Sequence, residues 1–340
     1  MLEFQMVYYI PMYKVFITRQ IPDIGISMLQ ERGYEVVVGS WKVPPTKKQI
    51  ISALKKHRPQ ALLTLLTDQI DTEVIDICAT LGIKVISNYA VGFNNIDVVH
   101  ASTHGIVIAN TPGHFSDCIA EHTVALALGL STRLVEGDRF LRKGKYKGWD
   151  PMILTGTDLS GKVLGLVGAG RIGARAAYHL VKGFDMTCIY HDVKRNEELE
   201  RELGAVYVET NEEIYQKADI VSLHVPLLPS TKHMINAKTL AMMKPSTFLI
   251  NTSRGPVVDE VALVDALKKK VIAGAGLDVF EFEPKLAKGL VKLENVVLTP
   301  HIASARVSAR TEMATLAAQN IISVLEGQNP PGLVTIEMAK

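Results

Sequence analysis

The sequence predicts an α/β fold made of two doubly wound domains, each with a parallel β-sheet covered by helices on both faces. The chain has 340 residues, and single hydrophobic cores rarely extend beyond about 250–300 residues. Short apolar runs alternate with helical patterns over almost the whole length, which is typical of buried parallel strands separated by covering helices. A glycine-rich turn of the kind that binds dinucleotides lies near the middle of the chain, so we expect another domain before it.

The first part of the chain contains five apolar runs that predict strands, with helical patterns between them. Thr46 is a candidate N-cap for a helix over 46–57, because its hydroxyl can accept a hydrogen bond from the first helical turn. A second helix is expected over 71–81, followed by Gly82. Residues 1–12 are expected to form an extension outside the fold. The strands are expected near residues 14–18, 34–38, 61–66, 83–87 and 106–109.

Residues 116–141 form a long helical pattern whose apolar side chains lie on more than one face. A helix that is apolar all round is usually buried. We expect this helix to join the two domains and to face the second subunit of a homodimer. Burial between the domains of a monomer is the alternative.

The second part of the chain repeats the pattern with seven predicted strands. Thr210 and Glu213 have the spacing of a capping box, and Asp259 is placed to begin another helix. The last helix, near residues 304–326, is expected to return to the first domain. The strands are expected near residues 162–168, 186–191, 205–208, 219–225, 247–251, 273–279 and 296–299. We therefore predict a discontinuous substrate-binding domain of residues 13–112 and 300–330, and a nucleotide-binding domain of residues 113–299.

An apolar strand runs directly into Gly168, Gly170 and Gly173, which have the spacing G-x-G-x-x-G. In this fingerprint the first glycine permits a tight turn, the second lets the backbone approach a pyrophosphate, and the third lets the following helix pack on the strand. The helix is expected over residues 172–182, ended by Gly183, and its first amides can bind phosphate. This strand, turn and helix predict a Rossmann domain that binds a dinucleotide.

The next predicted strand ends at His191 and Asp192, and Asp192 follows Gly173 by 19 residues. That spacing suits a carboxylate that accepts hydrogen bonds from the adenosine ribose of NAD and would repel the 2′-phosphate of NADP. Lys194 and Arg195 lie just beyond and could reach such a phosphate, unless they are simply charges of an exposed loop. The sequence therefore favours NAD and leaves NADP as the alternative.

The composition argues against several other classes of protein. The formal net charge of +2 predicts neither nucleic-acid nor membrane binding, and no apolar run reaches the roughly 18 residues of a membrane span. Cys78, Cys118 and Cys188 are widely spaced and odd in number, so they suggest neither a disulfide framework nor a zinc site. We expect a cytoplasmic protein without a bound metal.

Three polar segments follow predicted strands of the nucleotide-binding domain and contain Arg254, Glu283 and His301. Ligands of doubly wound sheets bind outside the carboxyl ends of the strands, so all three segments can line one crevice. The guanidinium of Arg254 can bind a carboxylate and the adjacent carbonyl. His301 can exchange a proton with an alkoxide near neutral pH, and Glu283 can orient its imidazole and favour the protonated form. These residue types suit hydride transfer between a nicotinamide cofactor and a 2-keto acid.

The chain resembles the D-2-hydroxyacid dehydrogenase family from about residue 13 to residue 330. It contains, in the family's order, the segments GAGRIG, NTSRG, LDVFEFEP and TPHIAS. The resemblance implies that Arg254, Glu283 and His301 are catalytic, that the substrate-binding domain is flavodoxin-like, and that the active site lies in the cleft between the domains. It also implies cofactor contacts along the fingerprint and the strand ends. The implied contacts are Gly168, Gly170, Arg171, Ile172, Gly173, His191, Asp192, His224, Val225, Pro226, Thr252, Ser253, Asp278 and Ala303.

Within that family, residues 87–97 resemble the substrate loop of glyoxylate and hydroxypyruvate reductases. By that resemblance Ala90, Val91 and Gly92 form the loop whose backbone N–H groups bind the substrate carboxylate. Trp149 resembles a tryptophan that closes the pocket from the neighbouring subunit, although it can equally be an ordinary packing residue. The implied activity is the reduction of glyoxylate or hydroxypyruvate to the D-2-hydroxy acid with NADH.

Two other functions stay open. Phosphite dehydrogenases share the fold, the three catalytic residues and a segment similar to residues 144–149, but they have a lysine where this chain has Val91. Corepressors of the same fold act as NAD-sensing scaffolds for peptides, and this sequence lacks the long disordered arms expected for such a role. Turnover of NADH with glyoxylate distinguishes an enzyme from a scaffold.

Overall fold

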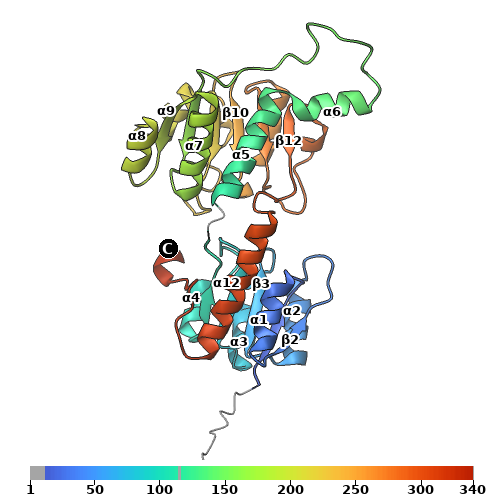
Figure 1. The fold of residues 1–340 in the computed structure, drawn as a ribbon, viewed down its shortest axis with the longest axis vertical. Helices are drawn as coiled ribbons and strands as arrows, with labels where there is room; N and C mark the ends of the chain where they lie inside the picture. Colours follow the sequence, from blue (N-terminus) through green and yellow to red (C-terminus); the bar gives the residue numbers. More distant parts are fainter. Residues whose placement is uncertain (1–11, 114–115, 340) are drawn as a thin grey trace, which may run out of the picture. The chain divides into compact units, whose positions relative to one another are not determined.

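The computed structural model describes residues 12–113 and 116–339, and the chain divides into two compact units (Figure 1). Unit 1 comprises residues 1–114 and 306–340, and unit 2 comprises residues 115–305. Residues 300–305 thus lie in unit 2, whereas the sequence analysis assigned them to the other domain. The reason is that the carboxylate of Asp278, in unit 2, accepts hydrogen bonds from backbone N–H groups of this segment. The extension expected at residues 1–12 lies, apart from Met12, outside the described residues.

Unit 1 contains a five-stranded sheet in the order β2-β1-β3-β4-β5, and every neighbouring pair is parallel. This is the flavodoxin-like strand order, and its switch point lies between β1 and β3. The strands are β1 (Lys14–Ile17), β2 (Glu35–Val38), β3 (Ala61–Leu65), β4 (Val85–Tyr89) and β5 (Val107–Ala109). The helices are α1 (Asp23–Glu31), α2 (Lys47–His57), α3 (Thr72–Thr80), α4 (Val98–Thr103) and α12 (Val307–Leu325), followed by the 3₁₀ turn η3 (Ile336–Ala339).

The last long helix, α12, packs on the sheet of unit 1 although unit 2 precedes it in the chain. The hydroxyl of Ser87 donates to the carbonyl of Ala317 (3.0 Å), and the hydroxyl of Tyr89 donates to the carbonyl of Arg310 (2.8 Å). Ser87 and Tyr89 both lie on β4, so this strand is tied directly to the helix that covers it.

Unit 2 contains a seven-stranded parallel sheet in the order β12-β11-β10-β9-β6-β7-β8. This is the strand order of a Rossmann domain with one further strand, and its switch point lies between β6 and β9. The strands are β6 (Val163–Val167), β7 (Thr187–His191), β8 (Val206–Tyr207), β9 (Ile220–Leu223), β10 (Phe248–Asn251), β11 (Gly274–Leu277) and β12 (Val296–Leu298). The helices are α5 (Ser116–Ser131), α6 (Leu134–Arg142), α7 (Arg171–Phe184), α8 (Glu197–Leu203), α9 (Asn211–Lys217), α10 (Ala237–Leu240) and α11 (Glu260–Lys268), with the 3₁₀ turns η1 (Gly255–Val257) and η2 (Leu290–Lys292). The predicted fold class is confirmed.

The helix expected over residues 116–141 is wrong as a single element. It divides into α5 and α6, which are bent by 60°. The break occurs because Arg133 takes a left-handed conformation (φ 54°) and the N–H of Thr157 donates to the carbonyl of Ser131. One face of helix α5 is buried within unit 2, where Leu126 and Leu130 join the core. Among the described residues no single helix has the length and hydropathy of a membrane span, and α5 and α6 reach those values only as a bent pair.

The helix after the glycine-rich turn is longer than expected. Gly183 lies inside α7, and the helix ends instead at Asp185, which takes the left-handed conformation (φ 53°) that usually follows a helix. Asparagine and aspartate tolerate this conformation better than most residues. The prediction that Gly183 ends the helix is therefore wrong.

The predicted helix starts are confirmed by their hydrogen bonds. The side chains of Thr46, Asp71 and Asp259 each accept a bond from the backbone N–H three residues further on. Thr210 does the same, but the side chain of Glu213 pairs with a lysine of its own helix. The reciprocal half of that capping box is thus not formed.

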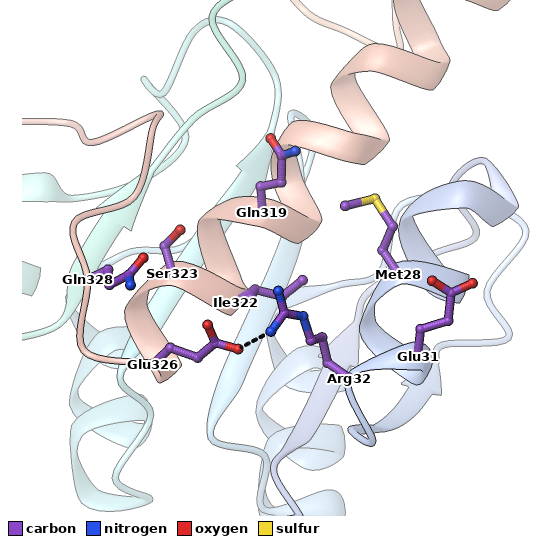
Figure 2. A pocket seen from close by; sticks show the side chains of 8 residues that line it. All are labelled: Met28, Glu31, Arg32, Gln319, Ile322, Ser323, Glu326 and Gln328. Carbon is purple, nitrogen blue, oxygen red and sulfur yellow. Dashed lines mark hydrogen bonds and ion pairs between the residues drawn. The ribbon is translucent and has the colours of Figure 1, made fainter. Parts of the chain in front are cut away.

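A pocket of about 480 Å³ lies between α1 and α12 of unit 1 (Figure 2). An ion pair between Arg32 and Glu326 (2.9 Å) crosses it, and Met28 and Ile322 supply apolar surface. None of the predicted site residues lines this pocket.

Candidate active site

The glycine-rich turn connects β6 to α7, next to the switch point of the sheet. Gly168 has φ 92°, and a Cβ atom there would lie 2.9 Å from the carbonyl of His224, so a larger residue would be strained. A Cβ at Gly173 would lie 2.4 Å from the carbonyl oxygen of Gly168. A Cβ at Gly170, by contrast, would meet no atom within 4 Å. The fold leaves this space open at the N-terminus of α7, where it fits the pyrophosphate of a dinucleotide.

The carboxylate of Asp192 lies against this turn, just after β7. One of its oxygens accepts a hydrogen bond from the N–H of Ala169 (2.7 Å), and the other accepts from the N–H of Lys194 (3.2 Å). Arg195 instead makes a bidentate ion pair with Glu200 (3.0 and 2.8 Å). The group in contact with the turn is therefore the carboxylate of Asp192, whereas the guanidinium of Arg195 is paired with Glu200.

The neighbouring strand ends supply two histidines. His224, after β9, has its Nε2 2.8 Å from the hydroxyl of Ser222, and burial lowers the pKa of His224 to about 4. Its ring is therefore neutral at physiological pH. His191, at the end of β7, has its Nδ1 2.9 Å from the carbonyl oxygen of Val208. The other predicted contacts on this edge, which are exposed or half-buried, are Arg171, Ile172, Val225 and Pro226.

Arg254 is held in place by the end of β10. The side chain of Asn251 accepts from the N–H (3.0 Å) and hydroxyl (2.8 Å) of Ser253 and donates to the carbonyl of Arg254 (2.9 Å). The Nη1 of Arg254 donates to the carbonyl of Ser253 (2.7 Å), while Thr252 is buried beside them. Burial lowers the pKa of Arg254, and the carboxylate of Glu283 acts in the opposite direction. Since arginine ordinarily stays protonated in proteins, the guanidinium remains charged.

Glu283 and His301 form an acid–base pair. Oε2 of Glu283 lies 3.1 Å from Nδ1 of His301, and Oε1 accepts from the N–H of Phe280 (2.9 Å). Burial opposes ionisation, but the contact with His301, the N–H of Phe280 and the charge of Arg254 together hold the pKa of Glu283 below its ordinary value. The ionised carboxylate thus fixes one ring nitrogen and leaves Nε2 to act as an acid or base.

His301 has an unusual backbone conformation, with φ 54°. This left-handed region is sparsely populated by residues other than glycine, so surrounding bonds must hold it. The N–H of His301 donates to the carbonyl of Asp278 (2.9 Å). The carboxylate of Asp278 accepts from the hydroxyl of Thr299 (2.6 Å) and from the N–H groups of Ile302 and Ala303 (2.8 Å each). The loop that carries His301 is therefore built around Asp278.

Asp278 is completely buried, and both oxygens of its carboxylate accept hydrogen bonds from the protein. Burial opposes ionisation, but the bonds from His122, Thr299 and the two loop amides hold the pKa of Asp278 below its ordinary value. His122 was missed by the sequence analysis. Its Nε2 lies 2.9 Å from the hydroxyl of Thr299 and 3.4 Å from Oδ1 of Asp278. The only sign of it in the sequence is that His122 is the single histidine of the apolar helix α5.

In unit 1, the loop of Ala90, Val91 and Gly92 follows β4, and its carbonyl groups are tied to the protein. Asn110 donates to the carbonyl of Val91 (2.7 Å), and Asn88 donates to that of Gly92 (3.0 Å). Within the described residues the N–H groups of Val91 and Gly92 have no hydrogen-bond acceptor. Two free amides in a fixed loop are suited to bind a carboxylate.

Trp149 lies apart from these residues, in an exposed segment of unit 2. Its side chain is 81% exposed, so the interpretation of Trp149 as an ordinary packing residue of its own chain is wrong. Figure 1 shows α6 and the segment after it extending away from the sheet of unit 2. Helix α6 has no buried residue, and residues 141–152 are all exposed. We call α6 together with residues 143–158 the arm.

The chain matches known proteins over most of its length. A family model described as the NAD-binding domain of D-isomer-specific 2-hydroxyacid dehydrogenases matches residues 124–303. The glyoxylate reductase of Thermofilum pendens is 47% identical, with 96% of each chain covered, and that of Thermococcus litoralis is 48% identical, with 94% of this chain and 96% of the relative covered. The structure is similar to that of an NADPH-dependent glyoxylate/hydroxypyruvate reductase from Sinorhizobium meliloti, solved with NADP and malonate, at a TM-score of 0.82 and 30% identity; 96% of this chain and 98% of the other are covered.

Proposed function

The chain belongs to the D-isomer-specific 2-hydroxyacid dehydrogenase family, and we propose that it is a glyoxylate reductase in which His301 is the general acid. The observation that carries the proposal is the pair of Glu283 and His301 (3.1 Å), with Arg254 close enough to lower the pKa of the same carboxyl. These groups follow the strands of the sheet that also carries the glycine-rich turn. An acid–base pair, a guanidinium and a dinucleotide site are what the reduction of a 2-keto acid needs.

Each residue has a defined role in this proposal. Arg254 binds the carboxylate and the keto oxygen of the substrate through its planar donors, and the free amides of Val91 and Gly92 bind the carboxylate. Bound NADH supplies the hydride to the keto carbon. His301 gives a proton from Nε2 to the oxygen that becomes the hydroxyl, and Glu283 holds the ring through Nδ1. In oxidation His301 takes that proton back. The product from glyoxylate is glycolate, which has no stereocentre, and a larger 2-keto acid such as hydroxypyruvate gives the D-2-hydroxy acid.

We propose hydroxypyruvate as a second substrate, because the similar Sinorhizobium meliloti enzyme is described as a glyoxylate/hydroxypyruvate reductase. The function is tested by supplying NADH with glyoxylate, hydroxypyruvate and bulkier 2-keto acids, and NAD with phosphite. We expect NADH oxidation with the first two and no reaction with phosphite, since Val91 offers no charge to a divalent oxyanion. Phosphite oxidation would identify a phosphite dehydrogenase, and tight NADH binding without turnover would identify a scaffold.

The cofactor is NAD, with NADP as an alternative, and Asp192 decides between them in our proposal. Asp192→Asn should lower kcat/KM for NADH about 10–100-fold, because a hydrogen bond to a charged group contributes about 1.5–3 kcal/mol. It should raise kcat/KM for NADPH by removing charge repulsion. Steady-state rates with both cofactors measure this, with Glu202→Gln, an exposed carboxylate of the same unit, as the control. A wild-type enzyme that prefers NADPH would overturn the assignment.

We propose that the arm docks on a second copy of the chain and makes a homodimer. Exposed apolar side chains along it support this, namely Leu134 (66%), Leu141 (61%), Tyr146 (50%), Trp149 (81%) and Met152 (76%). Large exposed apolar groups in one segment usually mark an interface. We expected residues 116–141 to face the second subunit; α6 is part of the arm, and α5 also keeps exposed positions, Asp117 and Ala125 among them.

Light scattering should give twice the chain mass for the wild type. Trp149→Ala should weaken the dimer roughly 30-fold, because interface hot spots contribute about 2 kcal/mol or more. Val291→Ala, which removes an exposed apolar group (65%) outside the arm, should leave the mass unchanged. A monomeric wild type at micromolar concentration contradicts the proposal.

A further inference from the structure

Three side chains of unit 1, none of them assigned a role above, converge on one point of the surface. They are Asp76 on α3, His100 on α4 and His104 at the C-terminal cap of α4. Oδ1 of Asp76 lies 2.7 Å from Nε2 of His100 and 3.2 Å from Nε2 of His104. The three ligand atoms all lie within 4.8 Å of one another.

The two helices fix this arrangement. His100 and His104 are four residues apart, so their rings lie on one face of α4, and the ring centroids are 4.8 Å apart. Asp97 caps the start of α4 by accepting from the N–H of His100 (2.9 Å). Helix α3 packs beside α4 and supplies the carboxylate.

We propose that Asp76, His100 and His104 bind one divalent transition-metal ion of the Zn²⁺ or Cu²⁺ type. Two imidazoles and a carboxylate are ligands that such ions prefer, and two histidines at i and i+4 of a helix are a recurrent zinc-binding arrangement. Ligand atoms about 2.0–2.2 Å from a tetrahedral zinc ion lie roughly 3.3 Å from each other. The separations of 2.7 and 3.2 Å between Oδ1 of Asp76 and the two imidazole nitrogens are close to this value. The two nitrogens lie within 4.8 Å of each other, so they need to approach by no more than about 1.5 Å.

The site is open to solvent, because the three side chains are 30% (His100), 36% (His104) and 56% (Asp76) exposed. An ion can enter without unfolding, and water completes its coordination. The ion then joins α4 to α3. Since α4 has only six residues, and short helices are marginal alone, this link stabilises the end of unit 1 that α4 covers.

Titration calorimetry of the chelator-treated, full-length protein with ZnCl₂ tests the proposal. We expect one Zn²⁺ per chain, at least a tenfold weaker affinity in His104→Gln, and unchanged affinity in His179→Gln. His179 is a matched control, because it has one acidic neighbour, Asp117 at 3.9 Å, and lies in unit 2. Equal affinity in wild type and His104→Gln, or no binding in either, would overturn the site and leave the cluster as hydrogen-bonded side chains only.

A spectroscopic measurement identifies the ligand atoms directly, rather than through a change in affinity. With Cu²⁺ bound, electron paramagnetic resonance should show two nitrogen ligands in the wild type and one in His100→Gln. A spectrum unchanged by this substitution contradicts the proposal. Circular dichroism checks that both variants fold.

Discussion

Replacing His301 with alanine should lower kcat for glyoxylate by about 10²–10⁴-fold, the usual contribution of a general acid. The affinity for NADH should stay the same, since the ring is bound to Glu283 rather than to the glycine-rich turn. Stopped-flow measurement of the chemical step and a fluorescence titration with NADH give the two quantities. Turnover at the wild-type rate would remove His301 from the mechanism.

The backbone of His301 requires a second variant. With φ 54°, alanine at this position is strained, so part of its effect could come from a displaced loop. Asparagine tolerates the left-handed conformation better and has no group that titrates near neutral pH. His301→Asn should therefore be as inactive as His301→Ala but unfold at the wild-type temperature. If His301→Asn were active, the loop conformation rather than the imidazole would matter.

Glu283 orients the imidazole of His301 through its contact with Nδ1. Its pKa lies below the ordinary value of about 4.3, so the carboxylate is ionised across the neutral range. Such a depressed pKa stabilises the folded protein above that ordinary value, and the contribution is lost as the pH falls through the lower, folded value.

The fold could be predicted closely because its signals are local. Apolar strands, the caps at Thr46, Asp71 and Asp259, and the glycine-rich turn each depend on residues near one another in the chain. The break after Ser131 could not be predicted in this way, because it depends on Thr157, a residue from a returning segment. The end of α7 at Asp185 was missed since a nearby glycine offered a more common signal.

The candidate site also combines features that local sequence predicts with contacts that only the structure shows. The types and spacing of Arg254, Glu283 and His301 pointed to proton and hydride transfer, but their supports come from distant parts of the chain. The carboxylate of Asp278 organises the His301 loop together with His122, which lies on α5. No short motif contains both residues, so their contact required the structure. The free amides of Val91 and Gly92 likewise depend on Asn110, a residue of the segment after β5.

Arg254→Lys should lower kcat/KM for glyoxylate about 10–100-fold, because charge-assisted hydrogen bonds contribute about 1.5–3 kcal/mol and an ammonium lacks the planar pair of donors. The loss should appear in both KM and kcat, since Arg254 is proposed to bind the carboxylate and the keto oxygen together. Arg32→Lys, an exposed arginine of unit 1 that pairs with Glu326, is the control and should leave the kinetics unchanged.

The pH profile separates this role from a merely structural one. Burial lowers the pKa of Arg254, yet a guanidinium keeps its charge across the working range. A lysine ammonium in the same buried place also has a lowered pKa, and from an ordinary value of about 10.4 it can lose its charge as the pH rises. The activity of Arg254→Lys should therefore fall with rising pH in a range where the wild type is still active. A profile parallel to that of the wild type would show that the charge of residue 254 does not bind the substrate.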